Sequence, residues 1–494
     1  MTSWPRICVC LLMVLFWTIS FEPAIAREMR VLSETIVGDP PALNEQTASD
    51  TEYQPVQERS ELPQRKQQPD EFDAIDLSPT SYQFSTGISS SQIFTDPQNA
   101  RVGTSLKFDP VSGSFGLSGS EKSIEVKRVD NKTGLYLGVE ASKGSFNGSV
   151  SLKQGLDTPR DSSLDSTVDL DVTSVGLNFG RMIHDEGSKS AVGSVTFGFT
   201  RHEYDLLVRD RVNAYIGGFA FPSSDVETTS GNFVSTDLGI SHTILVDDGF
   251  RLGVTQRYRV PISGDETRYR QFSTQVGISK DFGPGTKEQS RQLDTPSPGR
   301  CHAIEILGGD GFAVISGTET SSSAKRSIDV QNEIGWSASH LGARLRFGKN
   351  DKGCHELGGV QSDRTISYRV RGLDVNSSID VPLSGYELRY NFQPRLIKSE
   401  NSQTYVSIGS GLWIGDGESS TTSSFTFDNV SSTNTEKTEL VLLDLGVGLG
   451  SRQFLSERQY LFYELSTSRY DGRPLEKDVY GWENNIRAGA GLNF

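Results

Sequence analysis

The last eight residues of this 494-residue chain alternate strictly and stop on an aromatic side chain. In an extended strand successive side chains point to opposite faces. One face of this segment is then small or polar and the other is apolar: Gly489, Gly491 and Asn493 against Ala488, Ala490, Leu492 and Phe494. Such a two-sided strand is typical of a barrel wall that has lipid on its outer face.

The same alternation recurs throughout residues 301–494. Between Leu383 and Pro394 it is especially regular, with aromatic and aliphatic residues opposing charged and amide ones: Tyr386, Leu388, Tyr390 and Phe392 against Glu387, Arg389, Asn391 and Gln393. Apolar faces that carry aromatics, with charge on the opposite face, favour lipid outside and water or ion pairs inside. Eight strands are predicted here, near 302–316, 327–348, 362–373, 383–397, 402–416, 437–450, 459–470 and 481–494. The polar connections Gly317–Arg326, Leu373–Pro382, Asp416–Lys437 and Asp471–Tyr480 are predicted to be long outer loops.

Residues 81–282 show a similar pattern. In Val168–Arg181 the apolar face switches from Val168, Leu170 and Val172 to Val175, Leu177 and Phe179. We interpret this switch as a β-bulge near Thr173. Clustered Asp161, Asp165, Asp169 and Asp171 are more typical of a solvated acidic segment than of a Ca²⁺ site.

The predicted fold is therefore all-β, an antiparallel transmembrane β-barrel. We expect one barrel of about 16–18 strands, because a chain of this length usually closes once. The alternative is two tandem barrel-like units of about 8–10 strands, split at the Pro/Gly-rich linker 283–300. The expected divisions are 81–282 for the N-terminal half and 301–494 for the C-terminal half.

The amino terminus indicates export. Residues 1–26 combine a basic start, an apolar run and the small-residue site Ala24-Ile25-Ala26, a pattern that predicts a cleaved secretory signal peptide. Residues 27–80 are rich in Pro, Gln, Glu and Ser, which predicts a disordered periplasmic tether.

The carboxyl terminus resembles the assembly signal of Gram-negative outer-membrane β-barrel proteins, which places a polar residue, a glycine, an apolar residue and a final aromatic at set spacing. The matching positions are Arg487, Gly489, Leu492 and Phe494. The resemblance implies an outer-membrane location, with outer-membrane lipid, lipopolysaccharide and the barrel-assembly machinery as partners.

The charged side chains of the second half fall on the predicted inward face. They are Arg344, Arg346, Arg369, Arg371, Arg389, Arg487, Glu305, Glu333, Glu387, Asp444, Glu464 and Glu483. In a wide barrel they would line water, so we expect a porin-like passive pore for small polar solutes. In a barrel of eight strands they would pair and fill the interior, which leaves a closed structural, surface-display or adhesion protein without transport activity as the alternative.

Other classes of function receive little support. The net charge of −15 argues against a nucleic-acid partner. The six histidines are scattered, and no hydrolase or metalloprotease motif appears, so we expect neither an enzyme nor a cofactor. Cys301 and Cys354 are the two cysteines beyond the signal peptide, and we expect them to form a disulfide. A metal site with the adjacent His302 and His355 is disfavoured, because adjacent strand residues point to opposite faces.

Overall fold

The computed structural model describes most of the chain from residue 80 onward. The described residues are 80–95, 112–113, 116–131, 133–154, 162–184, 191–216, 219–247, 249–264, 269–282, 301–321, 326–349, 353–371, 375–394, 396–399, 402–425, 430–472 and 479–494. The predicted signal peptide, nearly all of the predicted tether and the linker 283–300 lie outside them. No helix in the described part of the chain is long and apolar enough to span a bilayer.

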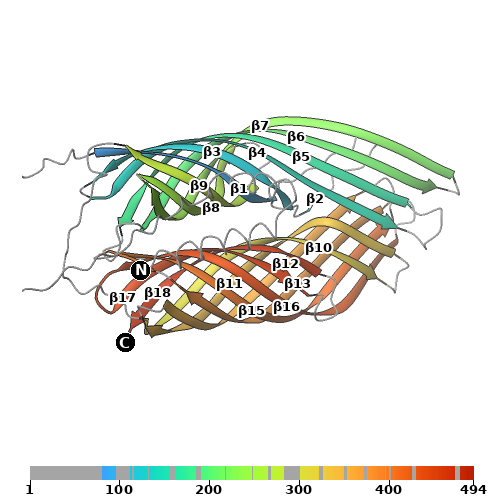
Figure 1. The fold of residues 1–494 in the computed structure, drawn as a ribbon. Helices are drawn as coiled ribbons and strands as arrows, with labels where there is room; N and C mark the ends of the chain where they lie inside the picture. The colour runs from blue at the N-terminus through green and yellow to red at the C-terminus, as the bar shows by residue number, and fades with distance from the viewer. Residues whose placement is uncertain are drawn as a thin grey trace, which may run out of the picture. The chain divides into compact units, whose positions relative to one another are not determined.

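The first half of the chain closes into one barrel of eight antiparallel strands (Figure 1). Its wall strands follow chain order, and β1 pairs with both β3 and β9 to close the ring. They are β1 (Thr80–Thr95), β3 (Gly116–Asp130), β4 (Leu135–Gln154), β5 (Ser162–His184), β6 (Ala191–Ile216), β7 (Phe219–Asp247), β8 (Phe250–Gly264) and β9 (Tyr269–Phe282). A two-residue strand, β2 (Ser112–Gly113), comes between β1 and β3 in the sequence.

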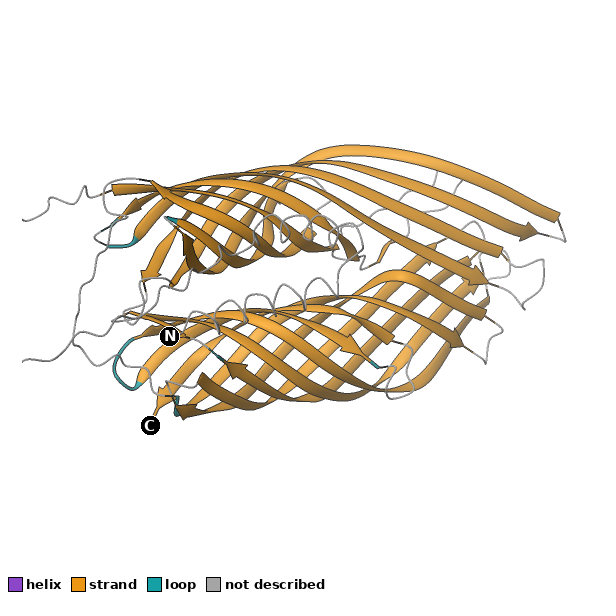
Figure 2. Ribbon diagram, viewed as in Figure 1, coloured by secondary structure: helices purple, strands orange, loops and turns teal. Residues whose placement is uncertain are grey.

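The second half closes into its own barrel of eight antiparallel strands. The last strand pairs with the first, and the pairing of β11 with β12 completes the ring. The wall strands are β10 (Ala303–Ser321), β11 (Arg326–Lys349), β12 (Gly353–Arg371), β13 (Val375–Gln393), β15 (Ser402–Phe425), β16 (Val430–Phe454), β17 (Gln459–Asp471) and β18 (Val479–Asn493). A short strand, β14 (Leu396–Ser399), pairs with β15. Figure 2 shows both barrels built from strands throughout.

Two tandem barrels correct the expectation of one barrel of 16–18 strands and confirm the alternative of two smaller units. The antiparallel all-β prediction is confirmed. Three of the four predicted outer loops are largely strand. β15 extends to Phe425 and β16 starts at Val430, so that most of Asp416–Lys437 is a paired hairpin. Most of the fourth, Asp471–Tyr480, lies outside the described residues. The loops are predicted from a composition rich in Ser, Thr, Asn, Asp and Gly, which a polar outer strand face shares.

The switch of the apolar face at Thr173 is not a β-bulge. Thr173 pairs with Lys143 on one side and Glu203 on the other, and the register is unbroken through this part of β5. The two ends of the strand instead face different surroundings. Towards His184 the outward side chains are apolar, and Leu177 is 48% exposed. Towards Ser162 the outward residues are polar, while Leu170 and its neighbours pack inside the barrel.

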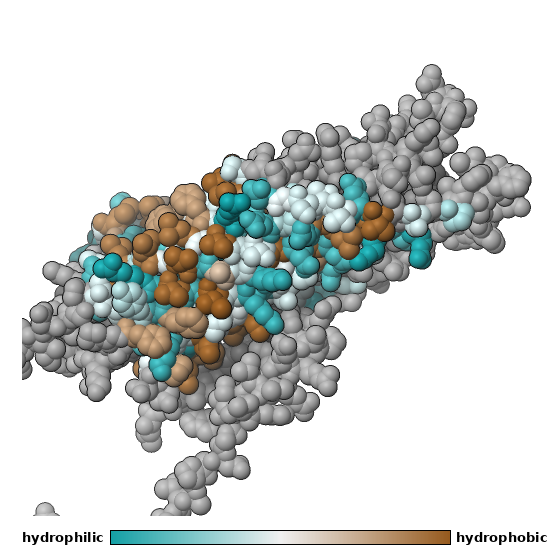
Figure 3. Space-filling model, turned by 90° about the horizontal axis from the view of Figure 1, so that it is seen from above, coloured by the Kyte–Doolittle hydropathy of each residue, from teal (hydrophilic) through white to brown (hydrophobic). Residues whose placement is uncertain are grey.

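On the strands next to β5, the outward apolar residues lie in register with those of β5. Leu177 pairs with Val139 and with Phe199, and all three point outward and are exposed. Figure 3 shows one outer face, where apolar residues gather most densely over one half and polar residues prevail over the other. The apolar band thus covers only one part of the long strands, and their remaining length has a polar outside and an apolar core.

In the second barrel, too, the outward residues change from apolar to polar along the strands. Tyr386, Ile414 and Val441 lie in register on the outer face of β13, β15 and β16. One step further along the strands, the outward positions in register are Ser384, Asp416 and Glu439. Inside the barrel at that point an apolar cluster replaces the charged residues: Ala313, Trp336, Ala338, Val381, Leu383, Trp413, Leu440, Leu442 and Tyr470. Both barrels therefore carry an apolar outer band over one segment, as a membrane-spanning wall requires, and continue beyond it as polar-surfaced β-structure.

An arginine scan on β5 tests where the lipid ends. Leu177→Arg should destabilise the folded protein in lipid vesicles by about 2 kcal/mol, because a cation on the lipid-facing side is costly. Thr173→Arg, four residues away on the same face, should change the free energy of unfolding by less than about 0.5 kcal/mol, since surface substitutions cost little. Guanidinium titrations monitored by circular dichroism measure both, because the tryptophans among the described residues all lie in the second barrel. Equal costs would contradict the proposed boundary.

Candidate functional site: the charged interiors of the two barrels

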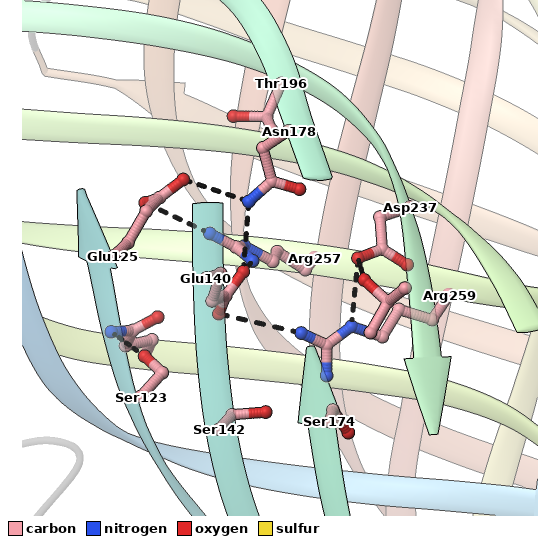
Figure 4. Close-up of polar contacts among 12 residues, drawn as sticks. Ser123, Glu125, Glu140, Ser142, Ser174, Asn178, Thr196, Asp237, Arg257 and Arg259 are labelled. Atoms are coloured by element: carbon pink, nitrogen blue, oxygen red, sulfur yellow. Dashed lines mark hydrogen bonds and ion pairs between the residues drawn. The ribbon is translucent and has the colours of Figure 1, made fainter. Parts of the chain in front are cut away.

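The first barrel encloses a cluster of seven buried charged side chains, three cationic and four anionic. They are Lys127, Arg257, Arg259, Glu121, Glu125, Glu140 and Asp237. Each lies on the inward face of its strand, because inward positions alternate with the outward apolar ones. The cluster draws on β3, β4, β7 and β8, and therefore crosses the interior (Figure 4).

Two arginines of β8 hold this cluster together. Arg259 Nη1 lies 3.0 Å from Glu121 Oε1, and Arg259 Nε lies 3.3 Å from Asp237 Oδ2. Arg257 pairs with Glu140 and lies 3.4 Å from Glu125 Oε2. A guanidinium offers several donors in a rigid fork, so one arginine bridges carboxylates from different strands.

Uncharged groups satisfy the remaining carboxylate oxygens. Asn178 Nδ2 on β5 donates to Glu125 Oε1 at 2.9 Å and to Glu140 Oε2 at 3.1 Å (Figure 4). Gln271 Nε2 donates to Glu121 Oε2 at 2.9 Å, and Ser142 also donates to Glu121. Buried charges are tolerated where such hydrogen bonds complete their pairing.

A polar chain that includes a histidine lies next to this cluster. Ser174 Oγ lies 2.7 Å from His202 Nδ1, and His202 Nε2 lies 2.8 Å from Ser235 Oγ. Ser235 in turn donates to Asp237 at 3.0 Å. These residue types also occur in hydrolases. Here, however, His202 is fully buried and stacks on Phe233 with ring centroids 4.4 Å apart, so this arrangement supports packing rather than contact with a substrate.

The second barrel encloses six arginines and six carboxylates among its described residues, and their formal charges cancel. Nine of the predicted positions are among them: Arg344, Arg346, Arg389, Arg487, Glu305, Glu387, Asp444, Glu464 and Glu483. The side chains of Arg369, Arg371 and Glu333 lie outside the described residues. The prediction missed three members, which are Glu356, Arg364 and Arg452.

Each missed residue lies where the pattern was hard to interpret. Arg364 has polar neighbours on the outward face, Asp363 and Thr365, so its segment shows no alternation of apolar and polar residues. Arg452 falls between the predicted strands 437–450 and 459–470, whereas β16 continues to Phe454. Glu356 precedes the predicted start of its strand by six residues, because Gly358 and Gly359 weaken the signal.

The charges of the second barrel form a network of ion-paired groups along the interior. Arg452 lies 3.1 Å from Glu305 Oε1 and 2.9 Å from Glu356 Oε1, and Arg344 joins Glu305 to Glu464. Further along the barrel, Arg389 Nη1 lies 3.0 Å from Glu387 and 2.7 Å from Asp444.

The network ends at aromatic side chains. Arg364 lies 2.9 Å from Glu483 Oε2, and its guanidinium is 4.3 Å from the ring centre of Trp413. Trp336 Nε1 donates to Glu483 at 2.8 Å. The apolar cluster that contains Trp336 and Trp413 begins at this point. Along the described wall, charged side chains and then apolar side chains therefore occupy the interior.

The predicted disulfide is present. Cys301 and Cys354 are bonded, with their Cα atoms 5.3 Å apart, and they link the start of β10 to β12. His302 is exposed, whereas both cysteines are buried, so the histidines and cysteines do not converge. No cluster with the composition of a metal site occurs among the residues that the structure describes.

The residues of the predicted assembly signal alternate as expected of a barrel wall. Arg487 lies in the interior, and Leu492 and Phe494 are exposed on the outer face, at 50% and 61%. Gly489 and Gly491 face inward beneath aromatic rings. A Cβ on Gly491 would come 2.1 Å from the Tyr460 ring, so only glycine fits there.

No protein-family model and no curated protein matches the chain. Among solved structures, Neisserial surface protein A is 11% identical, with 40% of this chain and 97% of that chain covered and a TM-score of 0.24. Ail, the attachment invasion locus protein of Yersinia pestis, is 12% identical, with coverages of 41% and 98% and a TM-score of 0.20. The outer membrane protease OmpT from Escherichia coli is 10% identical, with coverages of 85% and 99% and a TM-score of 0.23.

The Arg364–Glu483 pair offers a test of the filled interior. Arg364→Met should destabilise the second barrel by about 3–5 kcal/mol, because Glu483 loses its cation while buried. The double variant Arg364→Met/Glu483→Gln should recover part of that loss. As a control, Arg209→Met breaks an exposed pair with Asp169 and should cost less than about 1 kcal/mol. Denaturant titrations of the folded protein measure all three, and an Arg364→Met cost as small as that of the control would contradict a dry interior.

Proposed function

We propose that this protein anchors extramembrane β-structure on the bacterial outer membrane through two closed barrels and forms no diffusion pore. The observation that carries the proposal is the burial of the interior charges. Glu305, Arg364, Arg452 and Glu483 are all fully buried although each carries a charge. Charged side chains that lined a water-filled channel would retain exposed surface.

Barrel size supports the same conclusion. The interior of an eight-stranded barrel is just wide enough for side chains, whereas porins use 16–18 strands. Two separate rings of eight strands therefore provide far less space than the single ring on which the porin hypothesis depended. The closed structural or surface-display alternative fits the observed interiors better than passage of small polar solutes.

The length of the strands suggests what the anchors carry. A strand that crosses a membrane needs about 9–11 residues, whereas β6 has 26 residues and β7 has 29. In Figure 1, β5, β6 and β7 extend well past the ends of β8 and β9. The protruding part of the wall has polar outward residues such as Asp171, Glu203 and Asp205. We propose that this polar surface is displayed to the cell exterior as a structural or adhesive element.

The proposed location rests on the barrels themselves. Closed antiparallel barrels with an apolar outer band suit the outer membrane, where β-barrels are the usual spanning structures. The turn Leu455–Gln459 is short, as periplasmic turns are. We therefore propose that this end of the second barrel faces the periplasm, and that lipopolysaccharide and the barrel-assembly machinery are partners.

Planar bilayers test the closed interior. The purified full-length protein should insert without stepwise conductance at any voltage, because its interior charges exclude a water path. A 16-stranded porin inserted into the same bilayers serves as the positive control. Reproducible conductance steps from the protein would overturn the proposal.

Cysteine labelling on intact cells tests the orientation. Glu439→Cys, beyond the apolar band on β16, should react with a membrane-impermeant maleimide. Leu445→Cys lies on the same outward face of β16 within the band, and it should react weakly even after permeabilisation. Glu457→Cys, in the short turn at the opposite end, should react only after permeabilisation. Labelling of Glu457→Cys but not Glu439→Cys on intact cells would reverse the proposed orientation.

A further inference from the structure

Two lysines stand side by side at the edge of the apolar band of the first barrel. Lys122 on β3 and Lys143 on β4 are direct cross-strand partners, and both are exposed on the outer face. Cross-strand partners have Cβ atoms roughly 5 Å apart, and like charges at such positions are destabilising. The pair therefore concentrates two positive charges at one point on the wall.

Two other exposed cations on this barrel have anionic neighbours. Arg201 pairs with Glu203 at 3.2 Å, and Arg209 pairs with Asp169 at 2.5 Å. Lys122 and Lys143 form no ion pair with any residue in the described ranges. Their other direct cross-strand partners are uncharged, because Lys122 also pairs with Ile88 and Lys143 with Thr173, and the outward carboxylate of Asp171 lies one diagonal step from Lys143. An anion from outside the chain would relieve their repulsion.

An apolar strip begins directly next to the lysines on the same two strands. In register behind the pair come Ile124 with Ala141 and then Val126 with Val139. Ile124, Val126 and Val139 are each about half exposed, at 51%, 48% and 55%. Two cations that border an apolar strip match a molecule with an anionic headgroup and acyl chains.

We propose that Lys122 and Lys143 bind the phosphates of a phosphorylated glycolipid in the outer leaflet, with its acyl chains along the strip. The assignment to that leaflet rests on the proposed function. The second barrel is unlike the first at this boundary, since the cross-strand partners there are Asp416 and Glu439, which repel phosphate. Free phosphate would gain nothing from the apolar strip, so the lipid is the occupant that uses both features.

Lipid binding to the full-length protein tests the site. Detergent-purified protein is mixed with lipid A that carries two phosphates, with dephosphorylated lipid A, with phosphatidylglycerol, or with inorganic phosphate. Bound molecules are counted by native mass spectrometry. The double variant Lys122→Gln/Lys143→Gln should bind bisphosphorylated lipid A at least about tenfold more weakly than wild type, since both cations that attract the anionic headgroup are removed.

A matched variant controls for overall charge. Arg128→Gln/Arg181→Gln also removes two exposed cations, from the outward face of β3 and β5 at the opposite edge of the band, and should bind as wild type does. Heat-modifiable migration on gels shows that both double variants are folded. Equal losses in the two variants, or none in Lys122→Gln/Lys143→Gln, would overturn the proposal.

The remaining probes identify the source of the phosphate. Weak binding of dephosphorylated lipid A and of inorganic phosphate by all three proteins is expected. If phosphatidylglycerol bound as tightly and with the same dependence on the lysines, a glycolipid would be the wrong occupant. Failure of lipid binding leaves the closed-barrel proposal intact, because that proposal fails on conductance and labelling instead.

Discussion

The structure depends on one constraint, which is that each face of every wall strand must suit the medium it meets along its whole length. Next to hydrocarbon, the outward face is apolar and the inward face is free to be polar. Beyond the lipid the outside is water, so the apolar residues move to the interior. β5 shows both conditions in one continuous strand, from Leu170 inside the barrel to Leu177 outside it. The place where the apolar side chains change from the outer to the inner face is set by where the lipid ends, and it requires no irregularity in the backbone.

Closure of two small rings determines what happens to the charged residues inside. In the second barrel six arginines meet six carboxylates at close range, and in the first barrel three cations meet four anions. Pairing of this kind does little for net stability compared with an apolar core, because desolvation offsets the attraction. It does, however, make the removal of one partner costly. An interior filled by buried, paired charges suits a membrane anchor better than a channel.

The two ends of each barrel therefore contribute differently to function. In the proposed function the segment with the apolar band holds the protein in the membrane and, at its edge on the first barrel, presents Lys122 and Lys143 beside an apolar strip. The segment beyond the lipid carries the polar surface of the long strands, with an apolar core such as the cluster around Trp336 and Trp413 beneath it. The proposed anchorage, lipid recognition and display would thus use successive sections of the same strands.

Alternation in the sequence determined the strand class and the inward face. It determined these because side-chain direction has a period of two, whatever the partner strand is. Arg389 and Glu387 could therefore be placed in an interior before any ring was known. The number of rings, the ends of the strands and the partners of each charge depended on tertiary structure. Register and closure are set by pairing between distant segments, such as β1 with β9 and β10 with β18. Arg452 and Glu356 meet only because separate strands bring them together across the interior.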